Sequence, residues 1–163
     1  PDVYGGFGTS LRFYGVDFSI GFTYQLGGQV LDQGYRFYMN SPAGTSTGNN
    51  YHHDLLNSWT PENSGSNIPR FAYNDSNRAA VSDRFLTSAS YLNIQNITLG
   101  YTLPKRITRK FLVENLRIYL ACDNVWYWSK RQGLDPRQSI NGITNPYYYA
   151  PIRTFSGGVT VTF

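Results

Sequence analysis

The last ten residues, Thr154 to Phe163, alternate strictly between apolar and polar positions. The apolar positions, at every second residue, are Phe155, Gly157, Val159, Val161 and Phe163. A period of two is the signature of a β-strand with one apolar and one polar face. An aromatic residue that closes such a strand is typical of an outer-membrane β-barrel, whose strands face lipid on one side and a wet lumen on the other.

Four further segments alternate in the same way, at about Gly5–Tyr14, Asp17–Leu26, Tyr91–Leu103 and Leu116–Trp128. The residues on the apolar face of each segment are, in order, Phe7, Leu11 and Phe13; Phe18, Ile20, Phe22 and Tyr24; Ile97, Leu99, Tyr101 and Leu103; and Leu116, Ile118, Leu120 and Cys122. No Asp, Glu, Lys or Arg occupies these positions, as expected of strands in lipid, where a mid-membrane Arg or Lys costs about 2–4 kcal/mol. We therefore predict an all-β fold: about five antiparallel transmembrane strands of a barrel.

Two features interrupt this pattern. By alternation, Asn93 and Gln95 fall on the same face as Ile97 but are too polar for lipid. We therefore predict that this half of the strand projects beyond the membrane. Asn124 interrupts the apolar parity that continues through Trp126 and Trp128. We place these two tryptophans in the outer aromatic girdle of the barrel, since Trp gathers at membrane interfaces.

The connections between the predicted strands alternate in length. Gly15 and Val16 form a tight turn, and Pro104–Asn115 is a modest connection, whereas Gly27–Ser90 and Ser129–Arg153 are long. Outer-membrane barrels have short periplasmic turns and long extracellular loops. We therefore predict that Phe163 lies at the periplasmic end and that the two long connections lie outside the cell.

Five strands are too few for a complete barrel. Single-chain bacterial barrels use an even number of strands, at least eight, and each unpaired backbone group at an open edge in lipid costs several kcal/mol. We expect residues 1–163 to be the C-terminal part of a larger barrel. Composition agrees, with 17% aromatic and 15% charged residues, but an aromatic-rich soluble β-sandwich has a similar composition. Cys122 is the single cysteine, so the chain forms no internal disulfide.

Several motifs, taken in order, resemble the SusC/RagA family of TonB-dependent transporters. They are Asp2-Val3-Tyr4-Gly5-Gly6-Phe7, Trp59-Thr60-Pro61-Glu62-Asn63 with Asn67-Ile68-Pro69-Arg70, Asp83-Arg84-Phe85-Leu86, Ser90 to Tyr101, Leu116-Arg117-Ile118-Tyr119, Gly133-Leu134-Asp135-Pro136, and Tyr149 to Phe155 with the final Phe163. The resemblance implies a 22-stranded barrel in the Gram-negative outer membrane, with an N-terminal plug and a TonB-engaging segment. It further implies a SusD-like surface lipoprotein as a lid, and import of oligosaccharides or peptides. We expect the plug and the N-terminal half to lie outside residues 1–163.

The candidate ligand contacts are Tyr147, Tyr148 and Tyr149, whose rings suit stacking on sugars, although packing within the loop is the default role for such a cluster. Phe163 is a candidate signal for the barrel-assembly machinery, as the resemblance implies. Arg12, Arg117 and Asp123 are expected to face the lumen and to pair with each other or with the plug.

His52-His53-Asp54 suggests a metal site, but no third ligand has a suitable spacing, so we predict no metal and place these residues in a loop helix at Tyr51–Ser58. The basic cluster Lys105, Arg106, Arg109 and Lys110 has no accompanying nucleic-acid fold signature. We predict no cofactor, no nucleic-acid partner and no catalytic residue.

Two alternatives remain open at this point. A soluble β-sandwich that binds glycans would bury the Phe18–Tyr24 face against a second sheet, whereas a barrel would expose that face to lipid. An enzyme such as a glycoside hydrolase would need a positioned carboxylate pair, and the 10 acidic residues show no such signature.

Overall fold

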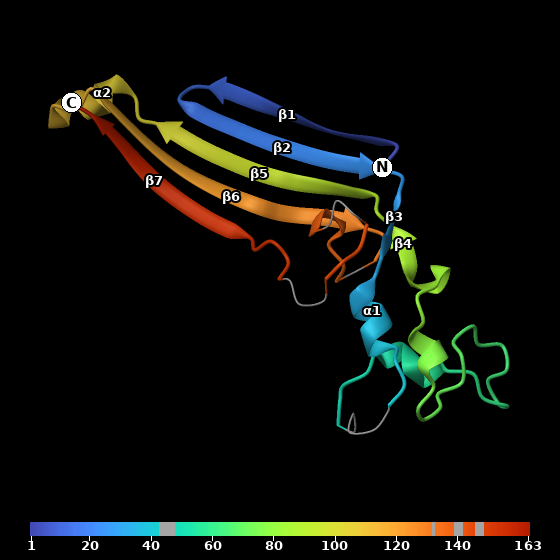
Figure 1. Cartoon of the computed structure of the whole chain (residues 1–163). Coiled ribbons are helices and arrows are strands. Elements are labelled where there is room, and N and C mark those ends of the chain that lie inside the picture. The colour runs from blue at the N-terminus through green and yellow to red at the C-terminus, as the bar shows by residue number, and fades with distance from the viewer. Residues whose placement is uncertain (43–47, 132, 139–141, 146–148) are drawn as a thin grey trace. The chain divides into compact units, whose positions relative to one another are not determined.

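The computed structural model describes residues 1–42, 48–131, 133–138, 142–145 and 149–163. The chain divides into two compact units (Figure 1). The sheet unit comprises Pro1–Gly28, Ser88–Asp135 and Tyr149–Phe163, and the loop unit comprises Gln29–Thr87 and Pro136–Tyr148. Among the described residues, none of the helices has the length and hydrophobicity that crossing a bilayer requires.

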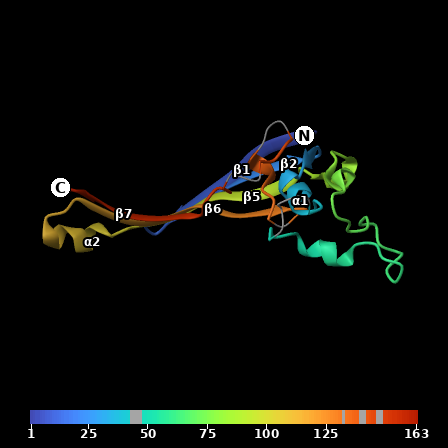
Figure 2. The same ribbon diagram turned by 60° about the horizontal axis from the view of Figure 1, so that its bottom comes forward.

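Five long strands form the sheet unit: β1 (Val3–Phe13), β2 (Val16–Leu26), β5 (Tyr91–Thr102), β6 (Asn115–Ser129) and β7 (Thr154–Thr162). They pair in the order β1-β2-β5-β6-β7, and every neighbouring pair is antiparallel. Figure 2, which turns the sheet toward its edge, shows the strands as one thin, curved layer. The predicted antiparallel strands are confirmed, with ends within two residues of those expected from the alternation.

The turn between β1 and β2 differs by one residue from the prediction. Phe13 pairs with Val16, so the turn consists of Tyr14 and Gly15, with φ values of 47° and 85°. Two successive positive φ values define a type I′ turn, whose twist matches that of a hairpin. A Cβ on Gly15 would lie 2.6 Å from the carbonyl oxygen of Thr102, which leaves glycine as the residue that fits there.

A β-bulge in β5 corrects the prediction for Asn93 and Gln95. Gly21 pairs with Asn96 and Phe22 with Ile94, so Gln95 is an extra residue on β5. The bulge brings Ile94 onto the same face as Ile97 and moves Asn93 to the opposite face. There Asn93 is buried and its Nδ2 donates to Thr23 Oγ1 at 3.1 Å. The prediction that Asn93 lies on the same face as Ile97 was therefore wrong, because the bulge shifts the alternation in this half of β5.

The interruption at Asn124 is also a bulge. Between the pairs Ile94–Trp126 and Asn96–Asp123, β6 advances by three residues while β5 advances by two. Asn124 adopts a left-handed backbone with φ of 50°, a conformation that Asn tolerates better than most residues. Its side chain donates to the carbonyl oxygen of Ile152 at 3.2 Å. The apolar face can therefore continue through Trp126.

Short connections lie at one end of the sheet. The ladder Val16–Tyr101–Ile118–Val159 runs beside the Tyr14–Gly15 turn, and α2 (Lys105–Thr108) with η4 (Arg109–Phe111) joins β5 to β6 at that end. The C-terminal residue Phe163 follows β7 at the same end, next to α2 (Figure 1). The predicted arrangement, with the short connections and Phe163 together, is confirmed.

The loop unit contains short elements around a small core. The elements are β3 (Gln29–Leu31), α1 (Gln33–Tyr38), η1 (His53–Asn57), η2 (Ser76–Ala79), η3 (Asp83–Phe85), β4 (Leu86–Ser88) and η5 (Pro136–Gln138), and β3 pairs with β4. Leu31, Met39 and Phe85 form the core, with Tyr35, Leu55 and Ile68 packed against it. The predicted helix at Tyr51–Ser58 is a shorter 3₁₀ helix, η1.

Candidate functional site

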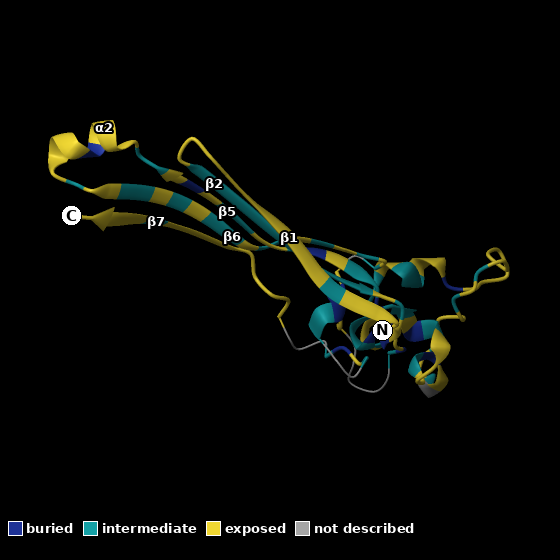
Figure 3. Ribbon diagram, turned by 90° about the horizontal axis from the view of Figure 1, so that it is seen from above, coloured by how far each residue is buried: buried dark blue, intermediate teal, exposed yellow. Residues whose placement is uncertain are grey.

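One face of the sheet is apolar across all five strands. The register aligns Ile20, Ile97, Cys122 and Phe155 across four strands, and Phe7 stacks on Phe22 with ring centroids 4.8 Å apart. These side chains remain open: Leu120 is 65% exposed and Phe155 76%. Figure 3 shows β1 and β7 exposed almost throughout and β2 at intermediate exposure. A contiguous apolar surface of this kind marks contact with a membrane or another protein.

The girdle candidates lie on this apolar face. Trp126 pairs with Ile94 and Trp128 with Leu92, close to the end of the sheet where the long connections begin. Both indoles are about half exposed, and the Arg153 guanidinium lies 5.7 Å from the ring centroid of Trp126. An amphipathic ring beside a cation suits the boundary between hydrocarbon and headgroups. Their role as a girdle stays a prediction.

The opposite face is polar and holds an ion pair that the alternation did not identify. Arg117 on β6 reaches across β5 to Asp17 on β2: Nε donates to Oδ1 at 3.0 Å and Nη2 to Oδ2 at 2.6 Å. The bridge passes over Gly100, where an added Cβ would lie about 2.5 Å from Asp17 Oδ1. A bidentate Arg–carboxylate pair fixes geometry as well as charge.

The expected lumenal residues all lie on this polar face. Arg12 pairs with Asp17 in the β1–β2 register, Arg117 pairs with Thr102, and Asp123 pairs with Asn96. Within the described residues, Arg117 forms an ion pair, and its partner is Asp17. Sequence spacing could not reveal this pair, because the two residues lie 100 positions apart on strands that are not adjacent.

A buried arginine holds the loop unit together. Arg78 is 4% exposed, and its guanidinium donates to the carbonyl oxygens of Met39, Pro69 and Arg70 and to Ser58 Oγ. These bonds measure 2.6 to 3.0 Å, and the guanidinium also lies 5.2 Å from the ring centroid of Phe71. Burial lowers the pKa of the Arg78 guanidinium, and the charge of Arg84 adds to this effect.

Arg78 explains part of the Trp59–Arg70 motif. Trp59 N donates to Ile68 O at 2.8 Å, and Asn63 Nδ2 donates to Asn57 O at 3.3 Å, so the segment folds back on itself. This fold turns the carbonyl groups of Pro69 and Arg70 toward Arg78. The motif therefore builds a backbone receptor for one guanidinium. Sequence reasoning missed Arg78, since an arginine in a polar loop resembles an ordinary surface charge.

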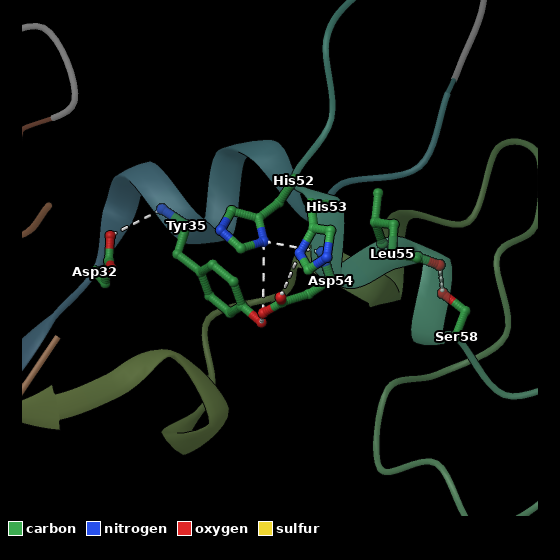
Figure 4. Close-up of polar contacts among 7 residues, drawn as sticks. All are labelled: Asp32, Tyr35, His52, His53, Asp54, Leu55 and Ser58. Atoms are coloured by element: carbon green, nitrogen blue, oxygen red, sulfur yellow. Dashed lines mark hydrogen bonds and ion pairs between the residues drawn. The ribbon is translucent and has the colours of Figure 1, made fainter. Parts of the chain in front are cut away.

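His52, His53 and Asp54 form a polar cluster with Tyr35 (Figure 4). The Tyr35 hydroxyl donates to Asp54 Oδ2 at 2.8 Å, and the Nδ1 atoms of both histidines lie 3.4 Å from the carboxylate. His52 Nδ1 also accepts from Asp54 N at 3.1 Å and so caps η1. The hydrogen bond from Tyr35 is the main cause that holds the pKa of Asp54 below its ordinary value, and the two histidines add to it. No group of three metal-ligating side chains occurs in the described part of the chain.

The loop unit also contains a pocket of about 460 Å³. It is lined by Gln33, Arg36, Phe37, Asn40, Ala79, Ile143, Thr144 and Asn145. Arg36 is fixed in its wall, because Nε donates to Ala79 O at 2.6 Å and Nη1 donates to Gln33 Oε1 at 2.8 Å. The pocket combines hydrogen-bonding groups with one aromatic ring, a lining typical of small-molecule sites.

The remaining candidates are only partly placed. Tyr147 and Tyr148 lie outside the described residues, and the side chain of Tyr149 is almost fully exposed. Phe163 is 88% exposed beyond the end of β7. Ligand contact by the tyrosines and recognition of Phe163 during assembly both stay predictions.

The fold is that of a segment of a transporter barrel. The RagAB peptide transporter matches it with a TM-score of 0.81 over 98% of this chain and 17% of that chain, at 23% sequence identity. The "closed-closed" state of the RagAB peptide importer matches with the same TM-score.

Sequence relatives agree with this class. The TonB-dependent receptors P3 and P26 of Formosa agariphila are 26% and 28% identical over the whole chain, which spans 16% and 17% of their lengths. The TonB-dependent receptor SusC of Bacteroides thetaiotaomicron is 36% identical over 84 residues, 51% of this chain and 8% of that receptor. No protein-family model matches. The predicted resemblance to SusC/RagA-type TonB-dependent transporters is confirmed, since these relatives are named as TonB-dependent receptors or a peptide transporter and none is named as an enzyme.

Proposed function

We propose that the chain forms the C-terminal strands of the barrel of a SusC-like TonB-dependent transporter in the outer membrane. The observation that carries this proposal is the apolar face that continues across five strands and remains exposed. Within the described residues, the outer edges of β1 and β7 have no partner strand, and strands in lipid need every edge paired. The rest of the barrel would supply those partners.

The proposed transporter imports oligosaccharides or peptides with energy delivered through TonB, together with a SusD-like surface lipoprotein. The polar face of the sheet, with the Asp17–Arg117 pair, would line the lumen and meet the plug. The loop unit would lie outside the cell, where its pocket and the tyrosines Tyr147–Tyr149 could contact substrate or lid. Similarity to TonB-dependent receptors along the whole chain supports this assignment.

Lipid exposure of the apolar face tests the proposal. In the full-length protein, with Cys122 and any cysteine outside residues 1–163 replaced by alanine, single cysteines at Ile20 and Val161 would carry a fluorescent label in vesicles that contain brominated lipid. We expect strong quenching at both positions and weak quenching at the neighbouring Ser19 and Thr160, which lie on the polar face. Equal quenching on both faces, or a dry protein environment at Ile20 and Val161, would overturn the proposal.

A further inference from the structure

We infer that the short helical connection between β5 and β6, residues 105–112, is an interfacial anchor that binds anionic phospholipid at the periplasmic leaflet. This inference rests on the proposed function, because it requires the sheet to stand in a membrane. The segment contains the basic cluster Lys105, Arg106, Arg109 and Lys110, to which the transporter fold alone gives no role.

The segment is amphipathic, although it is short. Its basic side chains, Lys105, Arg106, Arg109 and Lys110, are exposed, and so are the apolar side chains of Ile107 and Phe111. Thr108 is 2% exposed and packs on the protein. The basic and apolar side chains therefore both face outward.

Backbone hydrogen bonds hold the segment against the strand ends. Val113 N donates to Thr108 O at 3.2 Å, Glu114 N donates to Thr162 O at 2.8 Å, and Leu103 N donates to Leu116 O at 2.8 Å. The connection is therefore fixed where β5, β6 and β7 meet, beside Phe163. The apolar face of the sheet ends at this level, so an anchor here continues a surface that already faces lipid.

Exposed apolar side chains accompany the charges. Phe111 is 73% exposed and Leu112 is 89% exposed. Leu112 also has a left-handed backbone, with φ of 57° and ψ of 29°, which is unfavourable for a residue with a bulky side chain. Strained residues of this kind cluster at functional sites. Here the left-handed turn presents leucine outward beside Phe111, where water would be a poor solvent for both.

A phospholipid surface matches both properties. Basic residues on one side with Phe and Leu on the other are typical of helices that lie in the membrane interface. Each Lys or Arg near an anionic surface strengthens binding about fivefold. Glu114 is the single acidic residue in the whole Pro104–Asn115 connection, so the net charge of this connection favours anionic headgroups.

The test uses the full-length protein with Cys122 replaced by alanine and a bimane label on Phe111→Cys. Vesicles contain phosphatidylcholine with either brominated phosphatidylcholine or brominated phosphatidylglycerol as the quencher. We expect at least twofold stronger quenching by the anionic lipid. The variant Lys105→Gln/Arg106→Gln/Arg109→Gln/Lys110→Gln should lose this preference, whereas Lys130→Gln, at the other end of the sheet, should keep it.

Two reference labels separate the possible failures. A label on Tyr14→Cys, in the β1–β2 turn at the same end, should show no change of lipid preference in the quadruple variant. A label on Ile20→Cys reports on the barrel itself. Quenching at Ile20 without quenching at Phe111, or equal quenching by both lipids at Phe111, would overturn the anchor and leave the transporter proposal standing. Absence of quenching at Ile20 would overturn both.

Discussion

Replacing Arg78 should loosen the loop unit while the sheet stays intact. Arg78→Ala removes four hydrogen bonds from one guanidinium and leaves three carbonyl groups and a hydroxyl without their donor. A hydrogen bond to a charged group contributes about 1.5–3 kcal/mol, but four bonds of one group are not additive. A buried acceptor left without a hydrogen bond costs about 1–3 kcal/mol. We therefore expect the free energy of local unfolding of the loop unit to fall by about 3–4 kcal/mol.

Limited proteolysis of the full-length protein in detergent measures this change. When local opening is fast, the cleavage rate follows the population of the open form. A loss of about 3–4 kcal/mol should therefore accelerate cleavage within residues 48–87 by about 10²- to 10³-fold. Arg78→Lys, which keeps the charge but not the planar fork, should have an intermediate effect. The exposed Arg70→Ala is the matched control, because its carbonyl remains. If Arg78→Ala accelerates cleavage by less than threefold, the inference that Arg78 stabilises the loop unit is refuted.

Three further results are expected. The pKa of Asp54 is lowered in the folded state, so its ionised carboxylate stabilises the loop unit at pH values above the ordinary aspartate pKa, and this contribution is lost as the pH falls through about 4 and below. Proteolytic cleavage near η1 should therefore accelerate in acid. Asp54→Asn or Tyr35→Phe should flatten this pH dependence. Gly100→Ala should lower the urea concentration at the unfolding midpoint of the barrel, but less so in an Asp17→Ala background, and additive effects would argue against a shared ion pair. Deleting Phe163 should slow outer-membrane insertion in pulse-labelled cells, and normal insertion would count against its role in assembly.

The strands followed from the sequence because alternation has a direct physical cause. Lipid on one face and water on the other impose a period of two, and the charge-free parity survives across all five segments. The bulges at Gln95 and Asn124 could not be predicted by the same rule. A bulge changes which parity faces lipid, and its position depends on the register between neighbouring strands. For that reason Asn93 was assigned to the wrong face.

The loop unit was largely beyond prediction. Its stability depends on contacts such as those of Arg78 with the Met39 and Pro69 carbonyls, and no periodic pattern reports a side chain that donates to distant backbone. The motif around Trp59 resembled a family motif, but its sequence did not indicate that its backbone carbonyl groups accept hydrogen bonds from Arg78. On the polar face, Arg117 was placed correctly, while its partner Asp17 emerged only from the strand order.

If these strands belong to a closed barrel in a membrane, both edges of the sheet are paired. Hydrogen–deuterium exchange of the full-length protein tests this pairing most directly at the two edges of the sheet. On β1 and β7, alternate amides point away from β2 and β6, and in a closed barrel they pair with strands outside residues 1–163. We expect these outward amides to be as protected as those of the inner strand β5. Exchange of the outward amides within seconds, beside a protected β5, would show an open sheet and contradict the barrel.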